Sequence, residues 1–159
     1  MSDISELYRS DYSAWAQRNA ALLRAGDFAA LDIAHLLEEL DDMGKSEQRE
    51  LENRLTMLLA HLLKWEYQLP TLSARWREFD GRSWRATIIA QRDRLAKRLS
   101  KSPGLQASLP ATLAEAYDDA ARLASKETQL PRATFPATCP YSIAQILDDG
   151  FYPGPEASP

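Results

Sequence analysis

The stretch from Ser46 to Leu69 constrains the fold more than any other part of this 159-residue chain, because apolar residues recur there every three or four positions. At about 100° per residue, these side chains fall within about 100° of arc, the width of a helix face that is buried in a core. They are Leu51, Leu55, Leu58, Leu59 and Leu62. Ser46 is a suitable N-cap, and Pro70 cannot continue a helix. The sequence therefore predicts a central core helix over this stretch.

Composition favours helices along the rest of the chain. Valine is absent and threonine is sparse, so the β-branched residues that strands need are scarce. The length suits one domain with a substantial core. We therefore predict an all-α fold and a single helical domain over residues 1–159. In it, about five main helices form a bundle over residues 4–128, and a proline-rich C-terminal wrap follows over residues 129–159.

Apolar spacing, caps and breakers predict the remaining helices. These are expected at residues 4–25, 31–43, 83–100 and 110–128, with a short helix at residues 142–149. In the second of them, Leu36, Leu40 and Met43 are expected to face the core. Gly44 leaves two alternatives, one long bent helix or two separate helices. We favour a break at Gly44, because Ser46, which suits the N-cap of a new helix, follows closely.

Charge is distributed unevenly along the chain, although the net charge is only −4. Residues 1–63 carry six basic and twelve acidic residues, residues 64–101 carry ten and four, and residues 102–159 carry three and seven. This pattern fits helices of opposite charge that pack on each other, or an anionic partner, and the acidic total favours the first. No apolar run reaches the roughly 18 residues of a membrane span, so we expect no membrane. The acidic start differs from a signal peptide, which favours a cytoplasmic protein.

Three polar residues lie along one edge of the second predicted helix, and they are Asp32, His35 and Glu39. This spacing occurs among metal ligands in carboxylate-bridged bundles, but those sites need a second helix of the same kind. The central helix places Arg54 and His61 on an edge, with no carboxylate three positions before the histidine. The sequence therefore predicts no metal and no cofactor, and a hydrogen bond from His61 to a neighbouring element. A metal-binding or hydrolytic enzyme that uses the first edge stays as an alternative.

Arg92, Trp76 and Phe79 complete the candidate site residues. Arg92 falls inside an apolar stripe, where an arginine is tolerated if it extends to water or is paired. We predict a partly buried ion pair between Arg92 and Glu39. The two aromatic residues lie in an irregular polar stretch after Pro70, which predicts a contact surface.

Nine basic residues between positions 75 and 101, with two tryptophans among them, are the one feature that suggests nucleic acid. They share no single narrow face, and no helix-turn-helix pair is evident, so these residues are expected to form a solvated face. Nucleic-acid binding through this segment stays as a second alternative function. No Gly-rich phosphate loop, H-E-x-x-H or G-x-S-x-G motif occurs. By elimination, the leading prediction is a cytoplasmic protein-interaction or regulatory module, with a protein partner or self-association.

Six segments, in order along nearly the whole chain, resemble one family. They are LEELDDMGKSEQREL (37–51), LLAHLLKWEYQ (58–68), RSWRATI with QR (82–92), KSPGL (101–105), EAYDDA (115–120) and FPATCPYSIAQILDD (135–149). These segments resemble the bacterial family called domain of unknown function 29, which implies an all-α bundle of bacterial origin and no particular activity. Two features depart from the family pattern. The stretch between Gln68 and Arg82 is longer than usual, and Gln129 stands where a glycine often closes a helix.

Overall fold

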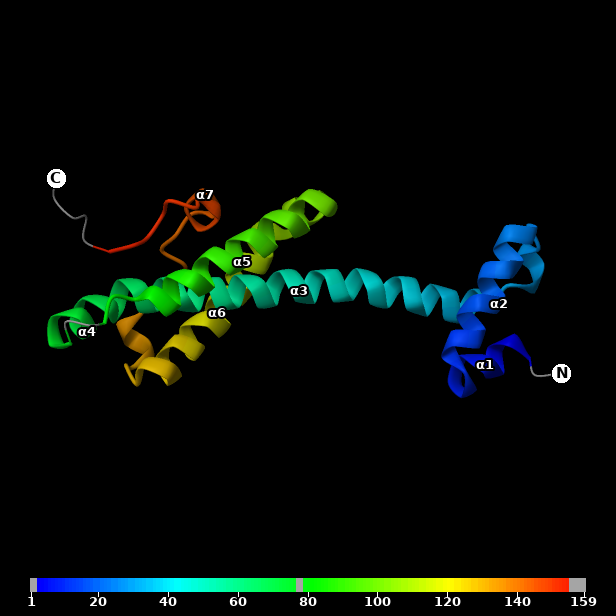
Figure 1. Cartoon of the computed structure of the whole chain (residues 1–159), viewed down its shortest axis with the longest axis horizontal. Helices are drawn as coiled ribbons and strands as arrows, with labels where there is room; N and C mark the ends of the chain where they lie inside the picture. The colour runs from blue at the N-terminus through cyan, green and yellow to red at the C-terminus, as the bar shows by residue number, and fades with distance from the viewer. Residues whose placement is uncertain (1–2, 77–78, 155–159) are drawn as a thin grey trace. The chain divides into compact units, whose positions relative to one another are not determined.

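The structure, a computed structural model, describes residues 3–76 and 79–154, and within these ranges it contains helices and no strand (Figure 1). The α-helices are α1 (Ile4–Ser10), α2 (Tyr12–Ala25), α3 (Ile33–Tyr67), α4 (Leu69–Arg75), α5 (Arg82–Lys101), α6 (Leu105–Thr128) and α7 (Ile143–Leu147). The 3-10 helices are η1 (Phe28–Ala30) and η2 (Arg132–Thr134). The predicted all-α helical bundle is confirmed.

The chain divides into two compact units, which are described separately here. Unit 1 comprises residues 1–47, and unit 2 comprises residues 48–159. The single domain expected from the chain length stays a prediction.

Asp11 divides the N-terminal segment of unit 1 into two helices, so the single helix predicted over residues 4–25 is wrong. The backbone of Asp11 is extended, with φ −152° and ψ 85°, and its carboxylate accepts a hydrogen bond of 3.0 Å from the Ala14 amide. Its own N–H donates to the Leu7 carbonyl at 2.8 Å, which closes α1. One residue therefore ends α1 and caps α2. Gly26 ends α2 in the left-handed conformation with φ 73°.

The helix α3 continues through Gly44, so the break favoured at this position is wrong, and so is the N-cap at Ser46. A Cβ added to Gly44 would meet no atom within 4 Å, so neither a turn nor a close contact requires a glycine here. Glycine inside a helix costs only about 1 kcal/mol, which a helix of 35 residues tolerates. α3 ends at Tyr67, before Pro70, as predicted.

The core of unit 2 lies where the C-terminal part of α3 meets α5 and α6. The five leucines of the predicted stripe are all buried in one cluster with Ile88, Leu95 and Leu99 of α5. From α6 the cluster receives mainly small side chains, which are Ala116, Ala120, Ala121 and Ala124. Because alanine side chains are small, α6 can approach the other helices of the core closely. The central core helix is therefore confirmed.

Both ends of α6 show how backbone chemistry sets a helix boundary. The helix begins at Leu105 and includes Pro110, whereas the sequence predicts a start at Pro110. Pro110 is the sixth residue of α6, inside the helix, so the Gln106 carbonyl lacks the bond that an N–H at this position would make, and the helix continues past it. At the other end, Gln129 adopts the left-handed conformation with φ 60°, the one positive φ outside glycine among the described residues. A glutamine therefore takes the place that glycine usually fills.

The segment after α6 is fastened to the helices of unit 2 by side-chain hydroxyls. The Tyr117 hydroxyl donates to the Pro136 carbonyl at 2.6 Å, and the Tyr141 hydroxyl donates to the Glu66 carboxylate at 2.6 Å. Within this segment Ser142 is the N-cap of α7 and forms a capping box with Gln145, and α7 lies inside the range predicted for a short helix.

Candidate functional site

Unit 1 brings together Asp32 and His35, two residues of the edge that the sequence singles out. The Asp32 oxygen Oδ2 accepts hydrogen bonds from Trp15 Nε1 at 2.8 Å and from His35 Nδ1 at 2.7 Å. The Asp32 backbone N–H donates to the Asn19 side chain at 3.1 Å. Burial alone would raise the pKa of Asp32, but the hydrogen bonds from Trp15 and His35 outweigh burial and lower that pKa. Asp32 therefore stays ionised and orients the imidazole ring.

Glu39, the third residue of this edge, is held by two tyrosines. Its two carboxylate oxygens accept hydrogen bonds from the Tyr8 hydroxyl at 2.6 Å and from the Tyr12 hydroxyl at 2.7 Å. The bonds from Tyr12 and Tyr8 lower the pKa of Glu39, and the same contact raises the pKa of Tyr8 to about 12. The Tyr8 ring also stacks on the His35 ring, with 4.1 Å between centroids. Both oxygens of Glu39 are therefore already engaged.

These contacts give Asp32, His35 and Glu39 a role in joining helices. Each acid accepts hydrogen bonds from α1 or α2, so the edge of α3 is fixed to the aromatic side chains of these two helices. Nucleophilic catalysis needs a nucleophile beside the histidine base. The ring that stacks on His35 is that of Tyr8, whose hydroxyl already donates to Glu39. Within residues 3–76 and 79–154, no three His, Cys, Asp or Glu side chains are grouped to hold a metal ion.

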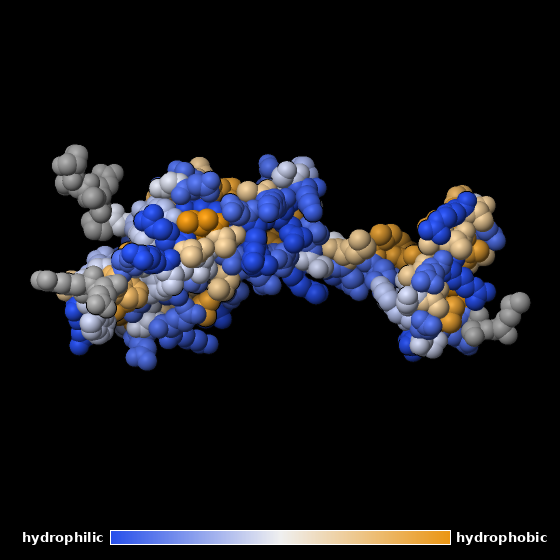
Figure 2. Space-filling view, in the orientation of Figure 1, coloured by the Kyte–Doolittle hydropathy of each residue, from blue (hydrophilic) through white to orange (hydrophobic). Residues whose placement is uncertain are grey.

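A row of large apolar side chains lies exposed on another side of α3. We call it the α3 stripe, and it consists of Ile33, Leu37, Leu40 and Met43, which are 52%, 56%, 61% and 62% exposed. At about 100° per residue these four side chains cover about 120° of arc. Figure 2 shows hydrophobic surface along this half of α3. The prediction that Leu40 and Met43 face the core is wrong, because α1 and α2 pack on the polar edge of α3 instead.

Acidic side chains line the α3 stripe. On the helical wheel Asp41 lies next to the stripe and Glu38 lies about 60° farther round, and both are exposed. Lys45 falls between them and balances part of their charge. We call Asp41 and Glu38 the acidic rim. Unit 1 as a whole contains ten acidic and four basic residues, a net charge of −6. The exposed apolar surface therefore lies in a negative electrostatic field.

Arg54 and His61 belong to unit 2 and have partners there. Arg54 forms an ion pair of 2.8 Å with Glu50 on its own helix. His61 donates from Nδ1 to the Met57 carbonyl at 2.8 Å, and burial lowers its pKa. The bond predicted from His61 to a neighbouring element is wrong, because the carbonyl four residues back in the same helix accepts it. Both residues therefore have a local structural role.

Arg92 is buried, as its position in the apolar stripe predicts, but its partners are backbone carbonyls. It donates to the carbonyls of Ile146 at 2.9 Å, Asp149 at 3.5 Å and Phe151 at 2.6 Å. Glu39 in turn is held by tyrosines of its own unit. The predicted pair between Arg92 and Glu39 is therefore wrong, and Arg92 fastens the C-terminal segment to α5 of unit 2.

The structure gives Trp76 and Phe79 different environments. Trp76 is exposed and lies under the Arg75 guanidinium, which is 5.0 Å from the centre of one of its rings. Phe79 packs edge-on against Trp84, with 5.1 Å between ring centroids. The contact surface predicted from these two residues stays a prediction, and Trp76 is the one that offers an exposed ring.

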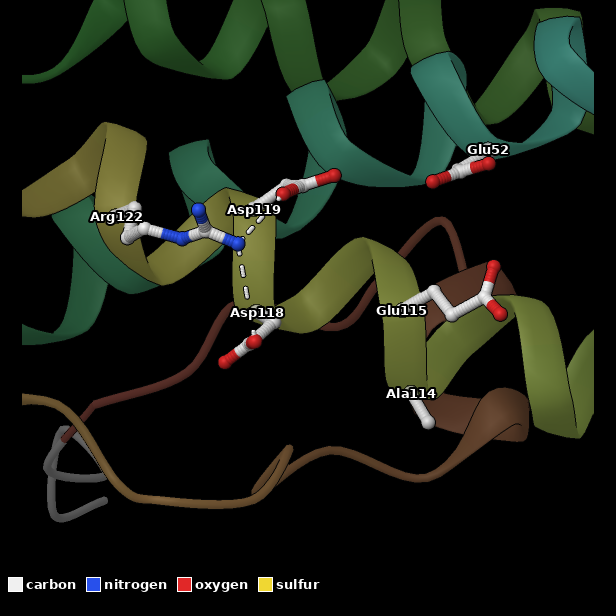
Figure 3. A pocket seen from close by; sticks show the side chains of 6 residues that line it. All are labelled: Glu52, Ala114, Glu115, Asp118, Asp119 and Arg122. Atoms are coloured by element: carbon white, nitrogen blue, oxygen red, sulfur yellow. Dashed lines mark hydrogen bonds and ion pairs between the residues drawn. The ribbon is translucent and has the colours of Figure 1, made fainter.

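A groove in unit 2 between α3 and α6 is lined by acidic residues. Figure 3 shows the residues that line it, which are Glu52 of α3 and Ala114, Glu115, Asp118, Asp119 and Arg122 of α6. The volume between them is about 440 Å³. Arg122 lies 3.0 Å from Asp119 and 3.8 Å from Asp118, which balances part of the charge. The remaining negative charge disfavours nucleic acid and other polyanions on this face.

Sequence reasoning missed two parts of unit 1. The α3 stripe has the apolar spacing of a core face, so its exposure was not expected from the pattern. Tyr8 and Tyr12, which donate to Glu39, lie on α1 and α2. The spacing of residues within α3 does not say how these two helices pack on it. The uneven charge is the signal that points to this region, since residues 1–63 carry twice as many acidic as basic residues.

No helix among the described residues is both long and apolar enough to cross a membrane.

Comparisons with known proteins identify the family of this chain. No curated protein and no solved structure matches the chain. The family model described as Domain of unknown function DUF29 matches residues 7–152, which is nearly the whole chain. The segments 37–51 and 135–149 fall inside this match, and so do all residues of the α3 stripe. The chain therefore belongs to the DUF29 family, whose description names no activity.

Proposed function

We propose that this protein is a protein-interaction module, and that the α3 stripe binds a basic amphipathic helix of a partner protein. The observation that carries the proposal is the exposure of four large apolar side chains along one helix, each more than half exposed. Exposed apolar surface of this continuity is typical of interaction sites. Ile33, Leu37 and Leu40 also have the i, i+4, i+7 spacing with which one helix contacts another.

The acidic rim determines the class of partner. Glu38 and Asp41 flank the stripe, and unit 1 carries a net charge of −6. Such a field attracts basic segments and repels nucleic acid and anionic lipid headgroups. A helix with an apolar face and lysine or arginine beside it fits both features.

The phase of α3 supports the same conclusion. At about 100° per residue, Ile33 and Leu37 fall on the same angular positions as Leu51 and Leu55, which are buried in unit 2. The sequence therefore places core-type residues on the same face in both parts of α3, separated by Gly44, Glu47 and Gln48, and the N-terminal part is exposed in the structure. A partner helix on this part would complete a helical bundle. We also propose a cytoplasmic location, because the one cysteine, Cys139, is a free thiol.

A peptide-binding experiment tests the proposal. The probe is a fluorescently labelled amphipathic helix of leucine and lysine, and the control probe is the same pattern with leucine and glutamate. Anisotropy should show binding of the lysine peptide only. Leu40→Ser should weaken binding about tenfold, because burying a leucine contributes about 1.5 kcal/mol or more.

Leu23→Ser is the matched control variant, since Leu23 is a leucine on α2 with 50% exposure. It should bind the lysine peptide with unchanged affinity, and circular dichroism should show that both variants stay folded. Equal binding of the two peptides, or an equal loss in both variants, would show that the α3 stripe is not the site.

A further inference from the structure

Two exposed helix faces of the described residues, the α3 stripe and the outward face of α5, are complementary in charge and in side-chain size. We infer that a second copy of the chain supplies the basic helix, and that the outward face of its α5 binds the α3 stripe. This inference rests on the proposed function, because it names the partner for the same surface.

The outward face of α5 has the composition that the α3 stripe requires. Ile89 is 49% exposed, and the other apolar side chains on this face, Ala86, Ala90 and Ala96, are small and exposed. Asp93, which is exposed as well, lies among them and is the one acidic residue of the helix. Arg94, Lys97 and Lys101 follow along one side of the same face, and all three are exposed. Overall α5 contains seven basic residues and one acidic residue. It is therefore the most basic helix of the described chain.

Size and length match as well as charge. The α3 stripe presents four large side chains, whereas α5 presents alanines around Ile89, so large side chains of one helix fit between small ones of the other. At 1.5 Å per residue, the stripe from Ile33 to Met43 is about 15 Å long, and the segment from Ala86 to Lys97 is about 17 Å long. The two faces therefore present contact surfaces of similar length.

The main charges of the two faces occupy corresponding positions. On the wheel of α3, with Ile33 at zero, Asp41 falls at about 80° and Glu38 at about 140°. On the wheel of α5, with Ile89 at zero, Lys97 falls at about 80° and Arg94 at about 140°. Lys45 lies between the two acids of α3, at about 120°, and Asp93 lies at about 40° on α5, so each ridge includes one charge of the other sign. The acids still outnumber the base on the α3 ridge, and Arg94, Lys97 and Lys101 outnumber the acid on the α5 ridge, so the two ridges have opposite net charge. Pairing of two α3 stripes would instead place one acidic rim near another, which disfavours a like-with-like contact.

The contact joins different surfaces of the two copies. Two copies that exchange both contacts form a closed dimer, and a contact that does not close produces longer assemblies. In either case the mass in solution depends on concentration, and salt weakens the association because the ridges are exposed.

Light scattering over a concentration series, together with charge reversal, tests the inference. The wild-type protein should reach at least twice the monomer mass. Glu38→Lys with Asp41→Lys should give the monomer mass, and so should Arg94→Glu with Lys97→Glu, because each variant places like charges on both faces. An equimolar mixture of these two double variants should recover the wild-type mass, since each contact then joins opposite charges again. The control, Glu115→Lys with Asp118→Lys on α6, makes the same change in net charge and should leave the mass unchanged.

Three results would overturn the inference: a wild-type mass that stays at the monomer value, double variants that still associate, or a mixture that does not recover. Circular dichroism establishes that the double variants are folded. If the wild type stays monomeric while the leucine and lysine peptide binds the α3 stripe, the inference fails and the proposed function stands. If the peptide also fails to bind, both fail.

Discussion

Arg92→Leu should destabilise unit 2 by about 3 kcal/mol. Its guanidinium is buried and donates two short hydrogen bonds, from Nε to Ile146 O at 2.9 Å and from Nη2 to Phe151 O at 2.6 Å. A hydrogen bond to a charged group contributes about 1.5 kcal/mol or more, so these two account for about 3 kcal/mol. The third bond, to Asp149 at 3.5 Å, is too long to add much.

Two further effects oppose each other in this variant. Leucine removes the desolvation cost of the buried cation, the same burial that lowers the pKa of Arg92. It also leaves the carbonyl of Ile146, a residue that is only 1% exposed, without its donor. We therefore keep about 3 kcal/mol as the expected loss in the free energy of unfolding.

Urea unfolding, followed by circular dichroism, measures this loss from the shift of the midpoint at an unchanged slope. Arg82→Leu is the matched control, because Arg82 lies on the same helix with a side chain 90% exposed, and it should change stability by no more than about 0.5 kcal/mol. Hydrogen exchange should be faster in residues 143–154 of the Arg92 variant than in the wild type. A free energy of unfolding within about 1 kcal/mol of the wild-type value, at about the accuracy of such measurements, would refute the role assigned to the three carbonyl contacts.

Three smaller changes test other parts of the structure. Asp32→Asn should destabilise unit 1 by about 1.5 kcal/mol, because an amide oxygen is a weaker acceptor for Trp15 and His35 than a carboxylate, and thermal unfolding measures the loss. The pKa of Asp32 is lowered in the folded state, so its contribution is present above its ordinary pKa and is lost as pH falls; below about pH 4 the difference between wild type and variant should shrink. Gln129→Gly should raise the free energy of unfolding by about 1 kcal/mol, because glycine adopts the left-handed conformation without strain, and an unchanged urea midpoint would contradict this. Gly44→Ala should raise the melting temperature, because alanine is about 1 kcal/mol more favourable than glycine inside a continuous helix, and a lower melting temperature would indicate a break.

Periodicity within one helix predicted the core of unit 2 well. Leu51, Leu55 and Leu58 are buried because their spacing alone requires an apolar partner on that face. Helix boundaries were less predictable. The sequence signals favoured a break at Gly44, where the helix continues, and gave none at Asp11, where it stops. A capping hydrogen bond and a glycine each change the helix free energy by about 1 kcal/mol, so the surrounding structure decides between the alternatives.

The candidate site was predictable only within one helix. His35 and Glu39 share an edge of α3 and Asp32 directly precedes this helix, as the spacing predicts, whereas Trp15, Tyr8 and Tyr12, which donate to the two acids, come from α1 and α2. The burial of Arg92 was likewise predictable, but its acceptors are carbonyls whose positions depend on the path of the C-terminal segment. Exposure of the α3 stripe was missed because apolar spacing says that a face suits burial and does not say whether another helix reaches it.

The middle of α3 is a weak point of the chain. Residues 41–46 are all exposed, so their backbone amides are protected by hydrogen bonds of the helix without cover from side chains of other elements. Opening a turn here exposes little apolar surface, and Gly44 lowers the cost further. A protease that requires an extended substrate would therefore cleave first near Lys45, while the chain on either side is still folded. Limited digestion with trypsin would thus release pieces that correspond closely to units 1 and 2, and each could be purified and assayed for binding by itself.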